Sequence, residues 1–546
     1  MKLRPYQREA IDATYDYFRT GQDSPLIVTP TGSGKSVILA MLIREVCDQW
    51  GDTQIIVLTH VKELVQQDAN KVAQAWPLAP LGIYSAGLKR RQLCQVTVAS
   101  IQSVYNKPHF HGRFELIIVD EAHLIPHSSE GMYRKFIDAS RAANPNTQVI
   151  GLTATPYRTR TGLLHKGEGA LFGGIAYEAN VADLIADGYL CRLTATHGAH
   201  VDLAGIKTTG GDFNLGQLGE RMSALDLVEE HADKIVQAFS DRLHWLGFCV
   251  TVEHAKVMSA AINRRGVAAD FVHGAMGHAE RDEKIRAFKA GETRCLFNMG
   301  ILTTGFDFPA IDAIACLRPT QSPGLYVQIM GRGLRPVYAE GFDLDEREGR
   351  LAAIAASPKQ NCLVLDFGGN VMRHGFIDKV EPPRRGVGGT REAPVKPCPK
   401  CGTYVPIMTK FCKGILADGA ECGHEFQISE RESESVAHAG AMLSTEVPPI
   451  EIDVDKVFYS KHVGRSGVPT LRVDYYLGLQ RVSEYICVEH AGFARVKAGR
   501  WWSRRMPRPL PDTVDEALEH ADYLAQPRKL LVSFAAKYPE IMQYTF

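Results

Sequence analysis

The stretch that most constrains this chain is residues 29–36, Thr-Pro-Thr-Gly-Ser-Gly-Lys-Ser. A short apolar run at 26–28 precedes it, and a helical pattern of apolar residues follows. This order predicts a strand, a glycine-rich turn and a helix start, which bind phosphate because N–H groups converge there and the helix N-terminus adds positive potential. Lys35 is then placed for the β- and γ-phosphates of a nucleotide, and Ser36 for Mg²⁺. Thr29 stands where the common pattern GxxxxGK(S/T) has its first glycine, which leaves open a glycine turn with a chance lysine.

A pair of carboxylates ends a later strand pattern. Residues 114–119 are mostly apolar and β-branched, and Asp120 and Glu121 follow them directly. Adjacent carboxylates at a strand end cost free energy unless a cation binds them. Asp120 is therefore a candidate Mg²⁺ ligand, and Glu121 a candidate base for an attacking water. Gln7, about twenty residues before the phosphate loop, is placed to pair with an adenine edge, although a plain helix start explains it equally well.

Strand and helix patterns alternate over residues 1–190 and again from about 225. Parallel strands need crossover helices, so the alternation predicts two parallel-sheet α/β units. The segment between them, 196–224, is less regular and rich in glycine, and we interpret it as a connection.

Two arginines in the second unit lack an acidic neighbour. Arg332 and Arg335 are three residues apart, so they share one face of a helical turn. Asp312 is the one acidic residue from 311 to 338. The two cations therefore predict an external anion, and a solvated basic face stays open as the alternative.

In this order the motifs resemble those of superfamily 2 helicases of the DEAH type, over residues 1–375. The motifs that carry the resemblance are Gln7 and the stretches 29–36, 120–123, 153–156, 303–307 and 328–335. The stretches 3–7, 58–67, 85–90 and 302–307, with a cysteine cluster after the motor, are more narrowly similar to the RadD-like bacterial and phage DNA repair helicases. The resemblance implies two tandem RecA-like domains, an ATP-binding domain at 1–195 and a helicase C-terminal domain at 225–375, with ATP in the cleft between them.

The resemblance also assigns roles to single residues. Its implied catalytic residues are Glu121 as base, Arg335 as arginine finger, Arg332 as a γ-phosphate contact, and Gln328. Its implied ATP contacts, with Mg²⁺ on Ser36 and Asp120, are Gln7, Arg4, Thr31, Gly32, Ser33, Gly34, Lys35, Ser36, Asp120, Gly305 and Asp307.

Four of the twelve cysteines cluster at Cys398, Cys401, Cys412 and Cys422. The others are scattered, mostly in apolar runs, as is typical of buried thiols in a reducing compartment. The cluster predicts a tetrahedral, structural zinc site in a ribbon at 397–428, which is too small to stay folded without metal. Nine residues separate Cys412 from Cys422, an irregular spacing, so His424 is an alternative to Cys422, and unmetallated surface thiols are another. Proline- and glycine-rich or polar linkers are expected at 376–396 and 429–449.

The last segment, 450–546, has strand-like alternation and helix signals, which predict an α+β domain. Within it, residues 491–508 hold six Arg or Lys, no acidic residue, and the aromatics Phe493, Trp501 and Trp502. Cations interleaved with aromatics favour single-stranded nucleic acid. A tryptophan pair in the core with the cations on a solvated face explains the stretch equally well.

These features predict an ATP-dependent DNA helicase or translocase acting in DNA repair, recombination or replication. The alternatives are the motor subunit of a restriction system, an RNA helicase, and an ATP-gated DNA-binding module without unwinding. The 62 basic and 62 acidic residues cancel, so any DNA surface must be local. The expected partners are single-stranded or branched DNA, with single-strand-binding or recombinase proteins as further candidates. No secretory segment or bilayer-length apolar run is seen, so we expect no membrane and the cytoplasm of a bacterial or phage-infected cell.

Overall fold

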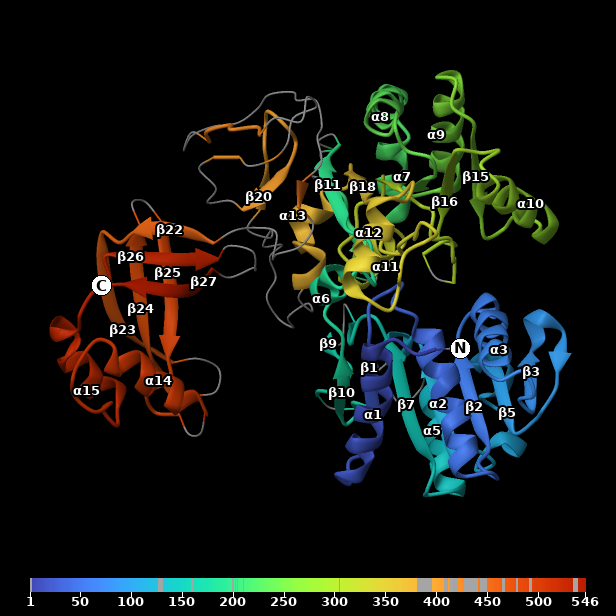
Figure 1. Ribbon diagram of the computed structural model, residues 1–546, viewed down its shortest axis with the longest axis horizontal. Coiled ribbons are helices and arrows are strands. Elements are labelled where there is room, and N and C mark those ends of the chain that lie inside the picture. The colour runs from blue at the N-terminus through green and yellow to red at the C-terminus, as the bar shows by residue number, and fades with distance from the viewer. Residues whose placement is uncertain are drawn as a thin grey trace.

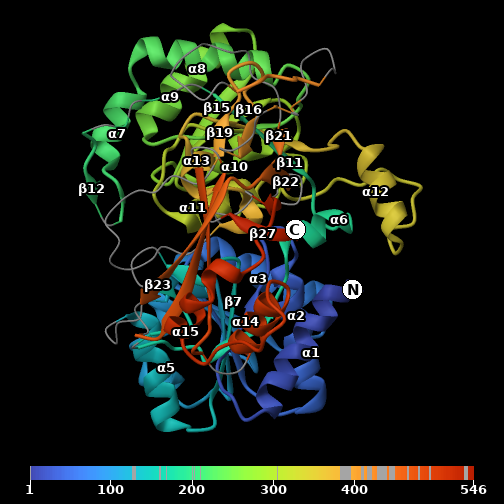
Figure 2. The same ribbon diagram turned by 90° about the vertical axis from the view of Figure 1, so that its left-hand side faces the viewer.

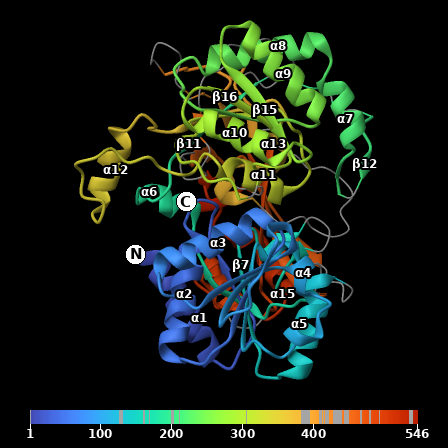
Figure 3. The same ribbon diagram turned by 90° about the vertical axis from the view of Figure 1, so that its right-hand side faces the viewer.

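The computed structural model shows two α/β domains stacked on each other, with a C-terminal domain to one side (Figure 1). Figures 2 and 3 show the same stacking from the two sides. The residues that the structure describes are 2–125, 131–158, 162–167, 169–198, 201, 203, 205–209, 211–303, 305–380, 395–406, 411–412, 414, 421–426, 440–441, 449–463, 467–477, 480–490, 493–533 and 539–546.

The first domain is built on one sheet whose neighbouring strands are parallel except for the last pair. The strand order is β10 (Gly174–Glu178), β1 (Pro25–Val28), β7 (Gln148–Thr153), β6 (Leu116–Asp120), β2 (Ile55–Thr59), β5 (Val96–Ser100), β3 (Leu81–Ser85) and β4 (Arg90–Arg91). The helices are α1 (Pro5–Arg19), α2 (Lys35–Gln49), α3 (Lys62–Ala75), α4 (Ile101–Val104), α5 (Met132–Ala143) and α6 (Val181–Ala186).

Helices cover both faces of this sheet, because each central strand is apolar on both sides. In β2, Ile55 and Val57 pack in one core with α1, α2 and α3. Ile56 and Leu58 pack in a second core with α5 and the segment around Phe110. A parallel sheet buried on both faces is the arrangement that uninterrupted apolar strands require.

The second domain repeats this architecture, with all neighbouring strands parallel except the last pair. The strand order is β15 (Ala269–His273), β16 (Cys295–Met299), β14 (Trp245–Phe248), β17 (Ala313–Cys316), β18 (Cys362–Asp366), β11 (Leu193–His197) and β21 (Gly440–Ala441). The helices are α7 (Leu215–Met222), α8 (Leu225–Ala238), α9 (Val252–Arg264), α10 (His278–Lys289), α11 (Pro323–Gly331), α12 (Arg347–Ala355) and α13 (Asn370–His374). Two stacked parallel sheets confirm the predicted pair of RecA-like domains.

The predicted boundary between the domains is wrong by a few residues. The chain enters the second sheet already at Leu193, which pairs with Cys362, whereas the prediction kept residues up to 195 in the first domain. The predicted connection 196–224 also packs on the second domain, since Leu218 and Met222 share a small core with Val250. The packing of this segment could not be predicted from the sequence, because it is rich in glycine and its strands, β12 (Thr208–Thr209) and β13 (Asp212–Phe213), are short.

The cysteine-rich ribbon lies against the second domain. Its hairpin is formed by β19 (Val395–Pro397) and β20 (Tyr404–Pro406). The Tyr404 hydroxyl lies 3.0 Å from Nδ1 of His197 and 3.4 Å from a carboxylate oxygen of Asp366. Strand β21, inside the predicted linker 429–449, extends the second sheet at its edge.

In its described residues, the C-terminal domain has two three-stranded antiparallel sheets and two α-helices, which agrees with the predicted α+β class. One sheet has the order β22 (Ile450–Asp453), β26 (Lys529–Ser533) and β27 (Glu540–Thr545). The other consists of β23 (Lys456–Val463), β24 (Pro469–Leu477) and β25 (Gln480–Ile486). The helices are α14 (Phe493–Ser503) and α15 (Val514–Glu519).

The helices throughout are of globular length. The longest, α1 and α2, have 15 residues. Within the described residues, none is both long and apolar enough to cross a membrane.

Candidate active site between the two domains

The phosphate loop has the predicted strand–turn–helix geometry. Gly32 and Gly34 adopt positive φ angles of 91° and 88°, a conformation that side chains disfavour. A Cβ at Gly34 would lie 2.6 Å from Nε2 of Gln7, so the position also lacks space. Thr29, at the place of the missing first glycine, continues β1, since its N–H donates to the Thr153 carbonyl at 3.0 Å. The departure from the common pattern therefore leaves the turn intact.

The side chain of Gln7 connects the phosphate loop to the start of α1. Its Nε2 donates to the Ser33 carbonyl at 3.0 Å, and its Oε1 accepts from the Arg4 N–H at 3.0 Å. The side chain is 3% exposed. Arg4 and Tyr338, by contrast, line the cleft itself. The contact of Gln7 with adenine stays a prediction.

Three buried carboxylates lie near Lys35 and Ser36. Asp120 ends β6 as predicted, and burial together with Glu121 raises its pKa to about 7. Burial disfavours the charge of Glu121, but Lys35 and His123 outweigh it and lower its pKa to about 2. The third carboxylate, Asp68 of α3, is fully buried, and neither of its oxygens makes a well-formed hydrogen bond to a described residue.

Asp68 is a site residue that the sequence reasoning missed. Burial and Asp120 raise its pKa, whereas the Ser36 hydroxyl and Lys35 favour its charged form. A signal was present: Leu64, Val65 and Ala69 mark the buried face of α3, and Asp68 falls on that face. An acidic residue on an apolar helix face is rarely buried without a partner.

Glu121 is connected to the second domain through His123. Glu121 itself has a φ of 53°, uncommon for a residue with a side chain. Its carboxylate lies 3.3 Å from Nδ1 of His123, and Nε2 of the same ring lies 3.1 Å from the amide nitrogen of Gln328. Nδ1 also lies 3.1 Å from the Thr153 hydroxyl, and with the proton on Nδ1, Nε2 accepts from Gln328. The candidate base and the second domain are thereby joined by two short contacts.

The two predicted arginines come from the second domain and meet the phosphate loop. Arg335 pairs with Asp307 at 2.7 Å, an acidic residue that precedes the segment 311–338. A Cβ at Gly32 would lie 3.1 Å from Cγ of Arg335, which shows how closely Arg335 and the phosphate loop approach each other. Arg332 is 4% exposed and donates to the Thr303 carbonyl at 2.8 Å.

Together these residues enclose a cleft of about 240 Å³. All the predicted residues of the ATP site line it except Gln7, Ser33 and Gln328. Lining residues that were not predicted are Val37, Leu64, Gln67, Lys71, Pro309, Pro336 and Tyr338.

Family comparisons agree with this geometry. Residues 1–158 match the family model described as type III restriction enzyme, res subunit. Residues 230–337 match the helicase conserved C-terminal domain. The chain carries the motor core of a superfamily 2 helicase. Proteins with this core form an ATP-hydrolysing class of enzymes, and the match leaves the ribbon and the C-terminal domain uncovered.

Similar proteins include helicases and a restriction enzyme subunit. "Putative ATP-dependent helicase IRC3" of Saccharomyces cerevisiae is 31% identical over 61% of this chain and 49% of its own length. "Putative mitochondrial ATP-dependent helicase irc3" of Schizosaccharomyces pombe is 28% identical over 68% of this chain and 58% of its own length. The type I restriction enzyme EcoAI endonuclease subunit of Escherichia coli is 25% identical over 64% and 45%. The chain thus spans about half the length of these relatives.

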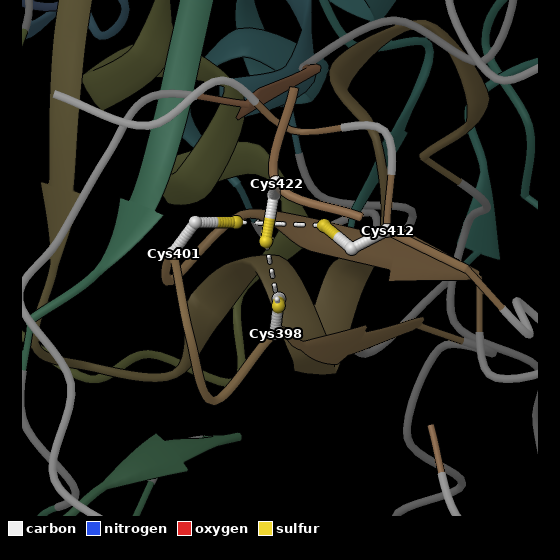
Figure 4. Close-up of side chains that lie close together, drawn as sticks. All are labelled: Cys398, Cys401, Cys412 and Cys422. Carbon is white, nitrogen blue, oxygen red and sulfur yellow. Dashed lines mark hydrogen bonds between the residues drawn. The ribbon is translucent and has the colours of Figure 1, made fainter. Parts of the chain in front are cut away.

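The four clustered cysteines converge as the sequence predicted (Figure 4). Their sulfur atoms all lie within 4.8 Å of one another, and all four residues are buried. The Cys398–Cys422 and Cys401–Cys412 sulfur distances are 3.8 and 3.4 Å, longer than a disulfide bond. The ring of His424 instead packs against Phe426 and is not part of the group.

The basic and aromatic stretch 491–508 does not form the predicted stacking platform. Trp501 and Trp502 are 7% and 1% exposed and belong to the core of the C-terminal domain. The guanidinium of Arg505 is also buried, 3.9 Å from the ring centre of Trp501. The side chain of Phe493 lies outside the described residues. Of the two interpretations of the stretch, the structure supports a tryptophan pair in the core.

Proposed function

We propose that this chain is an ATP-dependent DNA helicase or translocase of the RadD-like DEAH type, acting in DNA repair, recombination or replication. The observation that carries the proposal is the cleft in which Arg332 and Arg335 meet the phosphate loop of the other domain. Phosphoryl transfer needs positioning and charge stabilisation more than covalent chemistry. A cleft with Lys35 on one wall and Arg335 on the other is complete only while the domains are closed.

The carboxylate cluster fits a divalent cation. The buried carboxylates of Asp68 and Asp120 lie with Glu121 near the ammonium of Lys35, which places three groups of hard oxygen donors together. Ser36 and Asp120 would hold Mg²⁺ there. When bound, Mg²⁺ would neutralise charge on the β- and γ-phosphates.

The chain's own residues then perform the remaining work. Glu121 accepts the proton of the attacking water, and His123 holds its carboxylate in place at 3.3 Å. Arg335 exchanges Asp307 for the γ-phosphate as the transition state forms, since both compete for one guanidinium.

Hydrolysis is proposed to drive movement because it removes the γ-phosphate, which Lys35 of one domain and Arg335 of the other would both bind. The Gln328 contact to His123 and the contact of Lys62 with His278, 2.7 Å, both cross the domain boundary. When the γ-phosphate leaves, Arg335 returns to Asp307 and these contacts can separate. Opening and closing of two DNA-binding domains gives stepping along a strand.

The four cysteines are proposed to hold one structural zinc ion. A buried set of four thiols at these separations suits tetrahedral zinc with bonds of about 2.3 Å. Metal analysis of the purified full chain should find about one zinc per chain, which Cys422→Ser loses and the matched variant His424→Ala keeps. The opposite result would make His424 the fourth ligand.

A second candidate is the motor subunit of a restriction system, because the first domain matches the res-subunit model and a type I restriction subunit is among the relatives. Incubation with ATP and long duplex DNA distinguishes the two. Cleavage of the DNA supports restriction, and ATP consumption with intact DNA supports the helicase or translocase.

The deciding experiment measures ATP hydrolysis against single-stranded DNA, duplex, forked DNA and RNA, with strand separation recorded on the fork. We expect stimulation by DNA and a loss of at least about 100-fold in Lys35→Ala. Equal rates in wild type and Lys35→Ala would falsify the nucleotide assignment. Stimulation by RNA alone would make the chain an RNA helicase, and stimulation without strand separation a translocase or gated binding module.

A further inference from the structure

One face of the sheet β23–β24–β25 is open to solvent and carries aromatic and basic side chains. Residues alternate between the two faces of a strand. The inward face is apolar and buried, with Leu471, Val473 and Tyr475 at 0% exposure. The outward residues, from the strand pairing, are Lys456, Phe458, Ser460, His462, Thr470, Arg472, Asp474, Tyr476, Arg481, Ser483 and Tyr485. We call this set the outer face.

The aromatic rings of the outer face are available for stacking. Phe458 is 55% exposed and Tyr485 is 48% exposed. Each leans on a neighbouring ring, Phe458 on Tyr476 at 5.3 Å and Tyr485 on His462 at 4.9 Å between ring centres. These edge-on contacts fix the orientation of both rings and leave much of their surface in water. Exposed large apolar groups gathered on one sheet face mark an interaction surface.

The charge of the outer face is positive. Lys456, Arg472 and Arg481 oppose a single carboxylate, Asp474. That carboxylate is largely buried and accepts from Nε of Arg472 at 3.0 Å and from the Ser483 hydroxyl at 2.5 Å. Arg481 is farther from it, at 3.8 Å, and its side chain is 49% exposed. Lys456 and Arg481 are therefore the cations best placed for an anion from outside.

Cations and rings alternate across neighbouring strands. Tyr476 lies between Lys456 and Arg481 in one row, and Tyr485 pairs with Arg472, four residues away along β24. Adjacent strands are about 5 Å apart, so Tyr476 and Tyr485 each have a cation on a neighbouring strand. Phe458 pairs with Asp474, and its cation is Lys456, two residues before it on β23. A purely apolar protein partner would leave these cations without counter-charges, and a duplex would keep its bases stacked away from the rings.

We propose that the outer face binds single-stranded DNA, with Phe458 and Tyr485 stacking on bases and Lys456 and Arg481 contacting phosphates. Stacking platforms with interleaved cations bind single strands with little sequence preference. The choice of DNA over RNA rests on the proposed function, whereas the site itself does not depend on ATP hydrolysis. It would give the motor a second grip on the strand, on a domain separate from the cleft.

The test measures binding of a fluorescent thymidine oligonucleotide to the full chain without nucleotide, so that failure of the proposed ATPase does not affect it. Phe458→Ala with Tyr485→Ala should weaken binding at least about fivefold, and up to 150-fold for each platform lost. Phe458→Tyr with Tyr485→Phe should bind like wild type, because the rings are kept. Tyr523→Ala, which removes a ring that is 77% exposed elsewhere on the domain, is the matched control.

Salt dependence tests the cations separately. Each phosphate contact on a single strand contributes about 0.7 to the slope of log K against log salt. Lys456→Ala with Arg481→Ala removes two such contacts and should therefore flatten the slope by about 1.4. Arg504→Ala, which removes an exposed cation directly after the end of α14, should leave the slope unchanged. Melting curves establish that each variant is folded.

Three results would overturn the proposal. Wild-type affinity in Phe458→Ala with Tyr485→Ala removes the site. An equal loss for duplex of the same length shows that the rings do not stack on unpaired bases. Tighter binding of RNA than of DNA, lost in the same variant, makes the ligand single-stranded RNA.

Discussion

Arginine is used in opposite ways at two places in this molecule. In the cleft, Arg335 pairs with Asp307 at 2.7 Å and lies against the phosphate loop of another domain. In the C-terminal domain, the guanidinium of Arg505 lies 3.9 Å from the ring of Trp501 and 3.1 Å from the Tyr475 hydroxyl, all within one core. The first arginine can change partner when two domains separate, and the second cannot do so without local unfolding. An arginine at the boundary between two domains is available to a ligand, whereas an arginine packed within one core is not.

The sharpest test of this contrast is Arg335→Ala. The finger stabilises charge that is largest in the transition state, so kcat should fall by about 10³- to 10⁵-fold while nucleotide affinity hardly changes. Steady-state hydrolysis and binding of a non-hydrolysable ATP analogue measure the two quantities. Arg347→Ala, an arginine on α12 whose side chain is 51% exposed, is the control. A matching loss of affinity would make Arg335 a ground-state contact.

Trp502→Ala tests the other side of the comparison. Trp502 is 1% exposed in the core of the C-terminal domain, and removing a buried aromatic side chain costs about 3–5 kcal/mol. Calorimetry of the full chain should show one transition shifted to lower temperature, with the transition of the motor domains unchanged. Tyr523→Ala should leave both in place. If Trp502→Ala melted like wild type yet lost affinity for single-stranded DNA, the tryptophan would be an exposed platform after all.

The difference between the two regions also explains what could be predicted from sequence. Most of the residues predicted for an ATP site line one cleft, because their motifs occur in a fixed order at strand ends, and parallel sheets bring such ends together. The stretch 491–508 was judged by composition, which does not say which side of a helix faces the core. Trp501 and Trp502 are adjacent, yet both are buried, whereas Phe458 of β23 and Tyr485 of β25 are exposed.

The contacts missed in the cleft have a similar cause. The pairing of Arg335 with Asp307 joins residues on two loops that have no fixed spacing. Leu193 was assigned to the wrong domain because an apolar strand does not reveal the sheet it joins. Local sequence patterns predict single helices and strands. Which distant strands or loops pair with each other can be seen only once the fold is known.

Asp68→Asn asks how far the ATP site extends beyond its motifs. Neither carboxylate oxygen makes a well-formed hydrogen bond to a described residue, and burial raises the pKa of Asp68. The neutral amide should therefore leave the apo fold at least as stable, because burial disfavours the charged form. Asp68 neighbours Ser36, which is proposed to bind Mg²⁺. Asp68→Asn should therefore lower the apparent affinity for Mg²⁺ by about 10- to 100-fold.

Two measurements check this prediction. Magnesium titration of ATP hydrolysis gives the apparent affinity, and the rise in melting temperature with Mg²⁺ and an ATP analogue gives a readout apart from activity. Asp48→Asn on α2, whose side chain is 61% exposed, is the control. A destabilised apo protein with normal magnesium dependence would assign Asp68 to the fold instead of the site.

The smallest expected effect concerns the contact that links the candidate base to the second domain. Gln328→Ala removes the 3.1 Å contact to His123, and a neutral hydrogen bond contributes about 0.5–1.5 kcal/mol, or roughly 2- to 13-fold in rate. Because the contact crosses the domain boundary, DNA-stimulated hydrolysis should lose more than basal hydrolysis. Combining Gln328→Ala with His123→Ala in a double-mutant cycle measures the coupling, which should be nonzero for the stimulated rate. Additive losses in both rates would show that the two side chains act independently. Contact between the domains at the site would then depend on Arg332 and Arg335 and the phosphate loop, without the Gln328–His123 contact.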